Sequence, residues 1–172
     1  MPLAPSVKLT SNELDSALAY IEAAGASDFF PRPFEFSAIR QSWNKVRSVL
    51  EGVELLSYSP RSALEMIVPK QRCLVRPAHL LDPIDAIVYG GLVLRIAPAI
   101  QDNRNKYQVQ RIFSWHFNPI GTGADIFESD WDGYQAKARE LCLSYSFVAT
   151  ADVVDFYPRI YLHRLENAIS SA

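Results

Sequence analysis

Two carboxylates and a tyrosine are grouped near the end of the chain, in a pattern that suits metal and phosphate chemistry. Asp152, Asp155 and Tyr157 accompany an apolar stretch over positions 147–154. A carboxylate at the end of a buried strand is held rigidly, and carboxylate and carbonyl oxygens are the ligands that Mg²⁺ prefers. We therefore expect Asp152 to lie at the end of a core strand, with Tyr157 at the start of a helix whose first turn contains Pro158.

A second group of residues, further upstream, suits phosphate recognition. Lys70 and Arg76 lie in a stretch whose apolar residues alternate, which predicts two paired strands with a turn near Lys70 to Arg72. Their side chains bind phosphate oxygens through positive charge and, for arginine, through fork-like pairs of hydrogen bonds. A long helix capped by Asp82 is expected to follow and to end near Ile100.

These two motifs, in this order, resemble those of reverse transcriptases, in the form found in bacterial retron-like and phage-defence-associated enzymes. The segment 68–77 resembles the fingers hairpin of that family. The spacing from Asp152 to Tyr157, followed by Pro-x-Ile and a helix, resembles its motif A. The resemblance covers roughly residues 60 to 170. One departure lies in the turn of the hairpin, where the glycine that is usual in the family is missing.

The resemblance implies that the chain belongs to an RNA-directed DNA polymerase, which adds deoxynucleotides to a primer 3′-hydroxyl with two Mg²⁺ ions. It assigns both ions to the carboxylate of Asp152 and makes the carbonyl of Val153 a second ligand of one ion. Two-metal phosphoryl transfer also needs carboxylates on the other side of the ion pair. The chain contains no Tyr-x-Asp-Asp motif. We therefore expect it to be inactive alone, and to be completed by the rest of a longer protein or by a second polypeptide.

The same resemblance assigns the incoming deoxynucleotide to residues from both motifs. Lys70 and Arg76 would contact its phosphates. The backbone around Asp155 and Phe156 would lie under the triphosphate, and Tyr157 would exclude the 2′-hydroxyl that distinguishes ribose from deoxyribose. An RNA template and a DNA primer are the partners that this activity implies.

The expected elements mix helices and strands without regular alternation, which predicts an α+β fold. We expect a helical N-terminal extension over 1–58, the fingers with their β-hairpin and long helix over 59–128, and the start of a polymerase palm over 129–172. The incomplete palm is what the resemblance implies for a chain that contains motif A without the later carboxylates.

Local signals place the remaining elements. A capping signature at Ser11 begins a first helix, which Gly25 ends, and a second helix is expected over 39–52. A strand is expected over 109–117 and a loop over 118–130, before a further helix that starts at the end of this loop. The apolar residues expected to face inward from the first two helices are Leu14, Ala17, Leu18, Ile21, Ile39, Trp43, Val46 and Leu50.

Other interpretations of the same residues stay open. An aspartate pair before a helix is also typical of a helix cap and a solvated turn. His79, His116 and His163 could join Asp152 or Asp155 in the metal site of a hydrolase, but no two of these histidines share a helix or have a short ligand spacing. A non-catalytic module that binds RNA or a partner subunit could also be built on an inherited polymerase scaffold.

Charge is distributed unevenly along the chain, whose formal net charge is −2. Between Arg61 and Arg76 there are four basic residues and one acidic residue, whereas positions 125–155 contain seven acidic residues and two basic ones. Basic fingers and an acidic palm suit the opposite demands of phosphates and Mg²⁺.

We expect a cytoplasmic protein with no membrane span. The longest apolar stretch, 86–100, contains Arg95 and Pro98 and is too short to cross a bilayer. The N terminus lacks the basic and then apolar pattern of a secretory signal. Cys73 and Cys142 are too few for a disulfide scaffold, which fits a reducing compartment.

Overall fold

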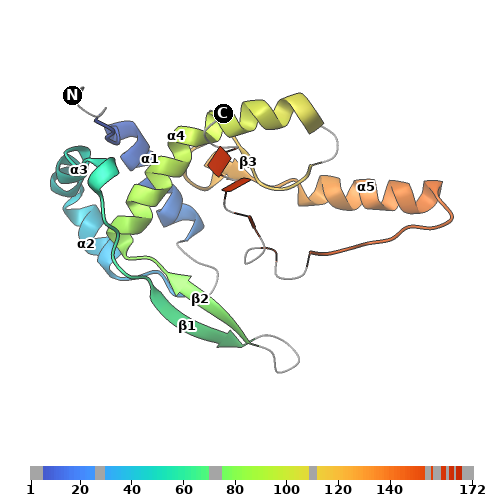
Figure 1. Ribbon diagram of the computed structural model, residues 1–172, viewed down its shortest axis with the longest axis horizontal. Helices are drawn as coiled ribbons and strands as arrows, with labels where there is room; N and C mark the ends of the chain where they lie inside the picture. The colour runs from blue at the N-terminus through green and yellow to red at the C-terminus, as the bar shows by residue number, and fades with distance from the viewer. Residues whose placement is uncertain are drawn as a thin grey trace. The chain divides into compact units, whose positions relative to one another are not determined.

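The computed structural model describes residues 6–25, 30–69, 75–108, 112–153, 156, 160–161, 163–164 and 166–167. It combines helices with two small antiparallel sheets (Figure 1), which confirms the α+β class. The elements are α1 (Ser11–Ala24), α2 (Glu35–Gln41), α3 (Trp43–Glu51), η1 (Leu55–Ser57), β1 (Leu64–Pro69), β2 (Val75–Leu80), α4 (Pro83–Gln108), β3 (His116–Phe117), η3 (Gly123–Ile126), β4 (Phe127–Glu128) and α5 (Trp131–Ser144).

The chain divides into two compact units. The first contains Met1–Arg95 and Ile120–Ile126, and the second contains Ile96–Pro119 and Phe127–Ala172. The boundaries expected for an extension, fingers and palm stay predictions.

Helix α1 begins at Ser11 and ends before Gly25 as its sequence predicts, but its capping residue is Thr10 and not Ser11. The Thr10 hydroxyl accepts a hydrogen bond from the Glu13 N–H, and the Glu13 carboxylate accepts one from the Thr10 N–H at 2.7 Å. This capping box satisfies backbone donors that have no partner within the helix. Gly25 ends the helix with a φ of 87°, a conformation that a side chain would disfavour.

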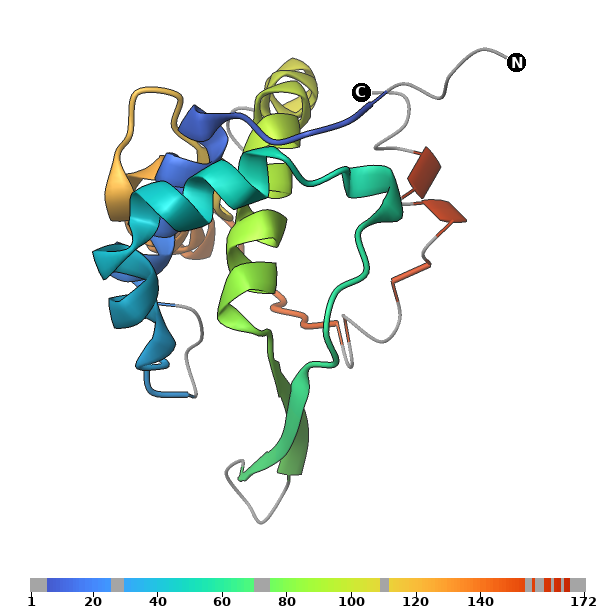
Figure 2. The same cartoon turned by 90° about the vertical axis from the view of Figure 1, so that its left-hand side faces the viewer.

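The core of the first unit is built from the predicted apolar faces. Buried residues of α1, α2, α3 and α4 form one cluster, whose members include Leu14, Leu18, Ile21, Phe36, Ile39, Trp43, Leu50, Ile87 and Val88. Figure 2 shows α1, α2 and α3 gathered beside the first half of α4. The helix predicted over 39–52 is two helices, because Ser42 leaves the helical conformation with φ −110° and ψ 20°. Both α2 and α3 still direct their apolar residues into this core.

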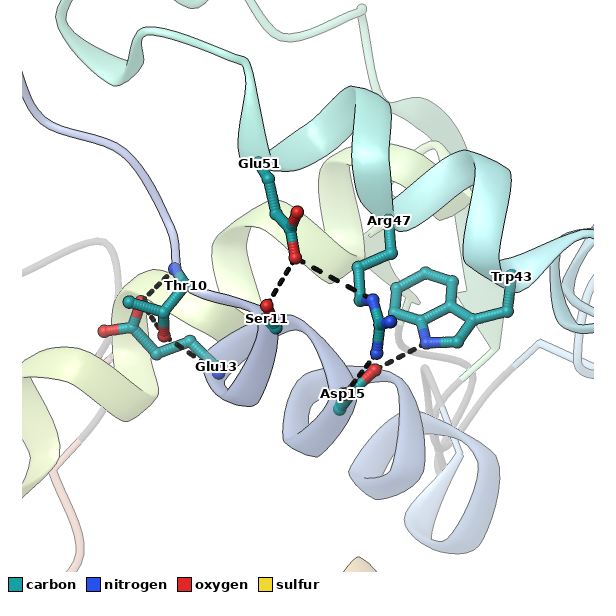
Figure 3. Close-up of polar contacts among 7 residues, drawn as sticks. All are labelled: Thr10, Ser11, Glu13, Asp15, Trp43, Arg47 and Glu51. Carbon is teal, nitrogen blue, oxygen red and sulfur yellow. Dashed lines mark hydrogen bonds and ion pairs between the residues drawn. The ribbon is translucent and has the colours of Figure 1, made fainter.

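Polar contacts join α1 to α3 at the edge of the core (Figure 3). The carboxylate of Asp15 accepts hydrogen bonds from Trp43 Nε1 at 2.6 Å and from Arg47 at 2.7 Å. The Ser11 hydroxyl donates to Glu51 at 2.5 Å. The mostly buried indole of Trp43 therefore keeps a partner for its N–H, as buried polar groups require.

Helix α4 is longer than predicted. It contains 26 residues with Pro98 inside it, rather than ending near Ile100. A proline removes one backbone hydrogen bond and bends a helix, but a long helix can continue past it. By length and composition alone, Pro83–Asn105 could cross a membrane, because the helix extends beyond the predicted apolar stretch 86–100 at both ends.

The first half of α4 nevertheless packs as a core helix. Ile87 and Val88 are buried in the core of the first unit. Arg95 donates to both carboxylate oxygens of Glu13 at 2.7 Å, and this hydrogen bonding is the main reason that the pKa of Glu13 lies below its ordinary value. Arg95 also donates to the carbonyl of Lys8, which fixes the segment that leads into α1.

The second unit departs from the predicted strand and loop. Over 112–117, only β3 is a strand, because the guanidinium of Arg104 binds the carbonyls of Ile112, Ser114 and Trp115 before it. The stretch predicted as a loop contains η3 and β4, and β4 pairs with β3 through Phe127 opposite Phe117. Contact between these two rings, whose centroids are 5.8 Å apart, favours the pairing.

Helix α5 starts at the predicted place, because the Asp130 carboxylate accepts from the Gly133 N–H at 3.0 Å. None of its residues is buried, and the Leu143 side chain is 90% exposed. The strand predicted over 147–154 is wrong for its described part, since 145–153 forms neither helix nor strand and Phe147 is 95% exposed. A strand needs a neighbour with free backbone groups, and the four described strands pair only in twos.

We expect Gly91→Ala to destabilise the first unit, although alanine favours helices. A Cβ at Gly91 would lie 2.9 Å from Cδ1 of the buried Leu9. Overpacking of this kind should lower the free energy of unfolding by about 1–2 kcal/mol. Leu9→Ala should open the space, so Gly91→Ala in that background should become neutral or stabilising by up to about 1 kcal/mol. Denaturant unfolding of the four variants measures this; equal effects in both backgrounds would show that the two side chains do not meet.

Candidate functional site

The predicted hairpin is formed by β1 and β2. Their antiparallel register pairs Val68 with Arg76 and Met66 with Ala78. Opposite residues of such a pair share a face, and so do alternate residues of one strand. We call the face with Leu64, Met66, Val68, Arg76, Ala78 and Leu80 the inner face. Arg76 is half-buried on it, and Ala78 is buried.

The opposite, outer face of the hairpin is exposed throughout. It consists of Glu65, Ile67, Pro69, Val75, Pro77 and His79. Arg76, the predicted phosphate ligand, therefore lies on the better covered face, on a strand whose backbone is fixed by pairing. Lys70, its predicted companion, lies outside the described residues.

Both ends of the hairpin meet the first turn of α4 in a polar group that we call the base cluster: Tyr58, Arg61, Asp82 and Asp85. The segment before β1 supplies the donors. The Tyr58 hydroxyl donates to Asp85, the Arg61 N–H donates to the same carboxylate at 2.9 Å, and the Arg61 guanidinium donates to Asp82 at 2.7 Å. Asp82 also caps α4 by accepting from the Ile84 N–H at 2.9 Å, as its sequence predicts.

Asp85 is the buried member of this cluster, with 5% of its surface exposed. A buried carboxylate is costly unless donors surround it, and here both donors come from the chain that leads into β1. Burial, followed by the hydrogen bond to Asp85, raises the pKa of Tyr58 to about 12. The phenol is therefore protonated at neutral pH and remains a donor.

Sequence reasoning counted Arg61 among the basic residues of the hairpin region but gave no role to Tyr58 or Asp85. One signal was available: Asp85 interrupts the apolar residues of a helix between Ile84 and Ile87. A carboxylate at such a position requires a partner from elsewhere in the fold.

The predicted metal and nucleotide residues near the C terminus are only partly described. Asp152 and Val153 are exposed and lie in an irregular stretch of the second unit. Phe156 is in a turn and is also exposed. Asp155 and Tyr157 lie outside the described residues.

The described residues hold no group of three or more His, Cys, Asp or Glu side chains placed to bind a metal ion. Within this part of the chain, Asp152 is therefore a single exposed carboxylate and not a closed Mg²⁺ site. Mg²⁺ is often held by one or two carboxylates together with substrate phosphates and water. Asp152 could supply one such ligand, but the described residues do not complete the set.

The histidines do not assemble a hydrolase site among the described residues. Each lies beside a different glutamate instead, at 3.7 Å for His79, 3.4 Å for His116 and 3.6 Å for His163. Such pairs are typical of polar surfaces, where they contribute little to stability.

Comparisons with known proteins identify no relative of this chain. No family model matches the chain, and searches of curated proteins and of solved structures find no match.

We expect Tyr58→Phe to lower the free energy of unfolding by about 1–2 kcal/mol at neutral pH, because the buried Asp85 loses a donor. The pKa of Tyr58 is raised from 10.0 to about 12 on folding. Its contribution should therefore be complete below pH 10 and be lost as the pH rises toward 12. Unfolding of both proteins across this range measures the difference.

The exposed Tyr89 offers a control for this prediction. Tyr89→Phe should change the free energy of unfolding by less than about 0.5 kcal/mol. A wild-type advantage over Tyr58→Phe that persists unchanged to pH 12 would contradict the assigned contact.

Proposed function

We propose that this chain contributes the fingers and the first part of the palm to an RNA-directed DNA polymerase. The observation that carries the proposal is the hairpin itself: β1 and β2 pair in the register that sets Arg76 opposite Val68, and α4 follows at once behind the cap of Asp82. This is the order that the resemblance to reverse-transcriptase fingers requires. It supports the proposal because a paired strand gives a phosphate-binding guanidinium a rigid support.

In the proposed enzyme, Arg76 and Lys70 hold the phosphates of an incoming deoxynucleoside triphosphate. Asp152, with the carbonyl of Val153, would hold the catalytic Mg²⁺ ions. In two-metal phosphoryl transfer such ions would supply activation of the primer hydroxyl and neutralisation of charge on pyrophosphate. The backbone at Asp155 and Phe156 and the side chain of Tyr157 are proposed to contact the nucleotide, with Tyr157 selecting deoxyribose.

The proposed partners follow from this activity. They are an RNA template, a DNA primer, a deoxynucleoside triphosphate and further polypeptide that supplies the remaining carboxylates. The proposed location is the cytoplasm, and the buried residues on the first half of α4 favour a helix packed within the protein over one that spans a membrane.

A second candidate function is a non-catalytic module that binds RNA or a partner subunit. The exposure of α5 favours it. No residue of this helix is buried, and the following stretch leaves Phe147 in solvent. Large apolar side chains that are exposed close together along the chain are typical of a surface that another polypeptide covers.

We expect Arg76→Ala to weaken dATP binding by about tenfold or more, because a charge-assisted pair of hydrogen bonds to phosphate is lost. The dependence of log Kd on log salt concentration should also become shallower by about one unit, as for the loss of one phosphate contact. Calorimetric titration at several salt concentrations measures both.

Arg40→Ala is the matched control for Arg76→Ala. It removes the same charge from α2, where Arg40 pairs with Glu22, and it should leave dATP affinity unchanged. Equal affinities for the wild type and Arg76→Ala would sink the assignment of Arg76 to phosphate.

We expect Mg²⁺-dependent primer extension on an RNA template only after the chain is mixed with a polypeptide that supplies a Tyr-x-Asp-Asp motif. Asp152→Asn should then lower the rate by at least about 10²-fold, since it removes charge that stabilises the transition state. Asp132→Asn, at an exposed position of α5, is the control and should retain the rate. Folded protein with no activity in any mixture would favour the non-catalytic module.

A further inference from the structure

The base cluster does more than stabilise the fold. We infer that Asp85 and Tyr58 are positioning residues: they set the direction in which the hairpin leaves α4, and thereby hold Arg76 where it meets phosphate. This inference rests on the proposed function. It assigns to two residues outside the recognised motifs a role in nucleotide affinity.

The described residues of the hairpin contribute few buried side chains that could fix its direction. A two-stranded ribbon is marginally stable alone, and among the residues of β1 and β2 only Ala78 is buried. The whole outer face is exposed. The orientation of the ribbon must therefore be set mainly where its two strands join the first unit.

At that junction, both strands are tied to one turn of α4. The end of β2 runs directly into Asp82, which caps the helix. The segment 58–61, which precedes β1, is fixed to α4 by the hydrogen bonds from the Tyr58 hydroxyl and the Arg61 N–H to Asp85. Since the carboxylates of Asp82 and Asp85 belong to the same helical turn, a displacement of β1 relative to α4 must break contacts to a buried charge.

The carboxylates of the base cluster already have donors from the chain itself. Asp85 accepts from two groups, and Asp82 accepts from the Arg61 guanidinium and the Ile84 N–H. The cluster is thus a support for the hairpin and not a ligand site of its own. Arg76 is the second residue of β2, at the end of the strand that is farther from the base cluster. A small change in the angle between the hairpin and α4 would therefore displace the Arg76 side chain.

The test compares dATP affinity with stability in matched variants. Asp85→Asn replaces the buried carboxylate, and Tyr58→Phe removes one donor with little change in volume. Asp15→Asn is the matched control, because Asp15 also accepts from an aromatic side chain and from an arginine, in contacts between α1 and α3. Calorimetry with dATP, thermal unfolding and amide hydrogen exchange are measured on each full-length variant.

We expect Asp85→Asn and Tyr58→Phe to weaken dATP binding by about fivefold or more, since misplacement of a ligand group is costly even without its loss. Amide exchange should accelerate in β1 and β2. Asp15→Asn should lower the thermal stability without changing affinity or hairpin exchange. If the Asp85 and Tyr58 variants bind dATP as the wild type does while Arg76→Ala does not, the positioning role is wrong and the proposed function stands. If the wild type itself fails to bind dATP, the proposed function fails and the inference with it.

Discussion

The burial of one carboxylate, that of Asp85, is the constraint on which the geometry of the hairpin depends. The charge lies at the start of α4 and has almost no access to water. In that setting the carboxylate depends on the Tyr58 hydroxyl and the Arg61 N–H, which belong to residues 27 and 24 positions earlier in the chain, respectively. The segment before β1 is therefore held by hydrogen bonds to a buried carboxylate as well as by the packing of Val53, Leu55 and Tyr58 against the core. Removing one of the two donors leaves the buried carboxylate with fewer hydrogen bonds than it needs, which costs far more than the loss of a surface contact.

Helix α4 links this cluster to the rest of the first unit. Its first turn holds the hairpin, its next turns bury Ile87 and Val88, and Arg95 binds both Glu13 and the segment before α1. Gly91 permits Leu9 to approach the helix axis closely. The apolar composition that makes α4 resemble a membrane span is, in this half, also the composition that lets one side of the helix pack against α1, α2 and α3.

The features that sequence predicts well here are those with short-range causes. The capping box at Thr10, the cap at Asp82 and the alternating strands of the hairpin are all encoded within a few residues. The base cluster was missed because its contacts are tertiary: nothing near Asp85 in the chain reveals that Tyr58 is its partner. The strand expected over 147–154 failed for a related reason. Apolar residues indicate a strand only if a neighbour is available to pair with it, and periodicity carries no information about neighbours.

The register of the hairpin has a further consequence, for the behaviour of the protein in concentrated solution. A short ribbon with Ile67 and Val75 exposed is the kind of element that recruits other strands and seeds cross-β aggregates. Pro77 faces Ile67, and Pro69 faces Val75, so two of the paired positions carry a residue without an amide hydrogen. Proline and the polar side chains of Glu65 and His79 make these edges poor templates for intermolecular pairing. The composition of the hairpin that contains Arg76 thus disfavours self-association through its strand edges.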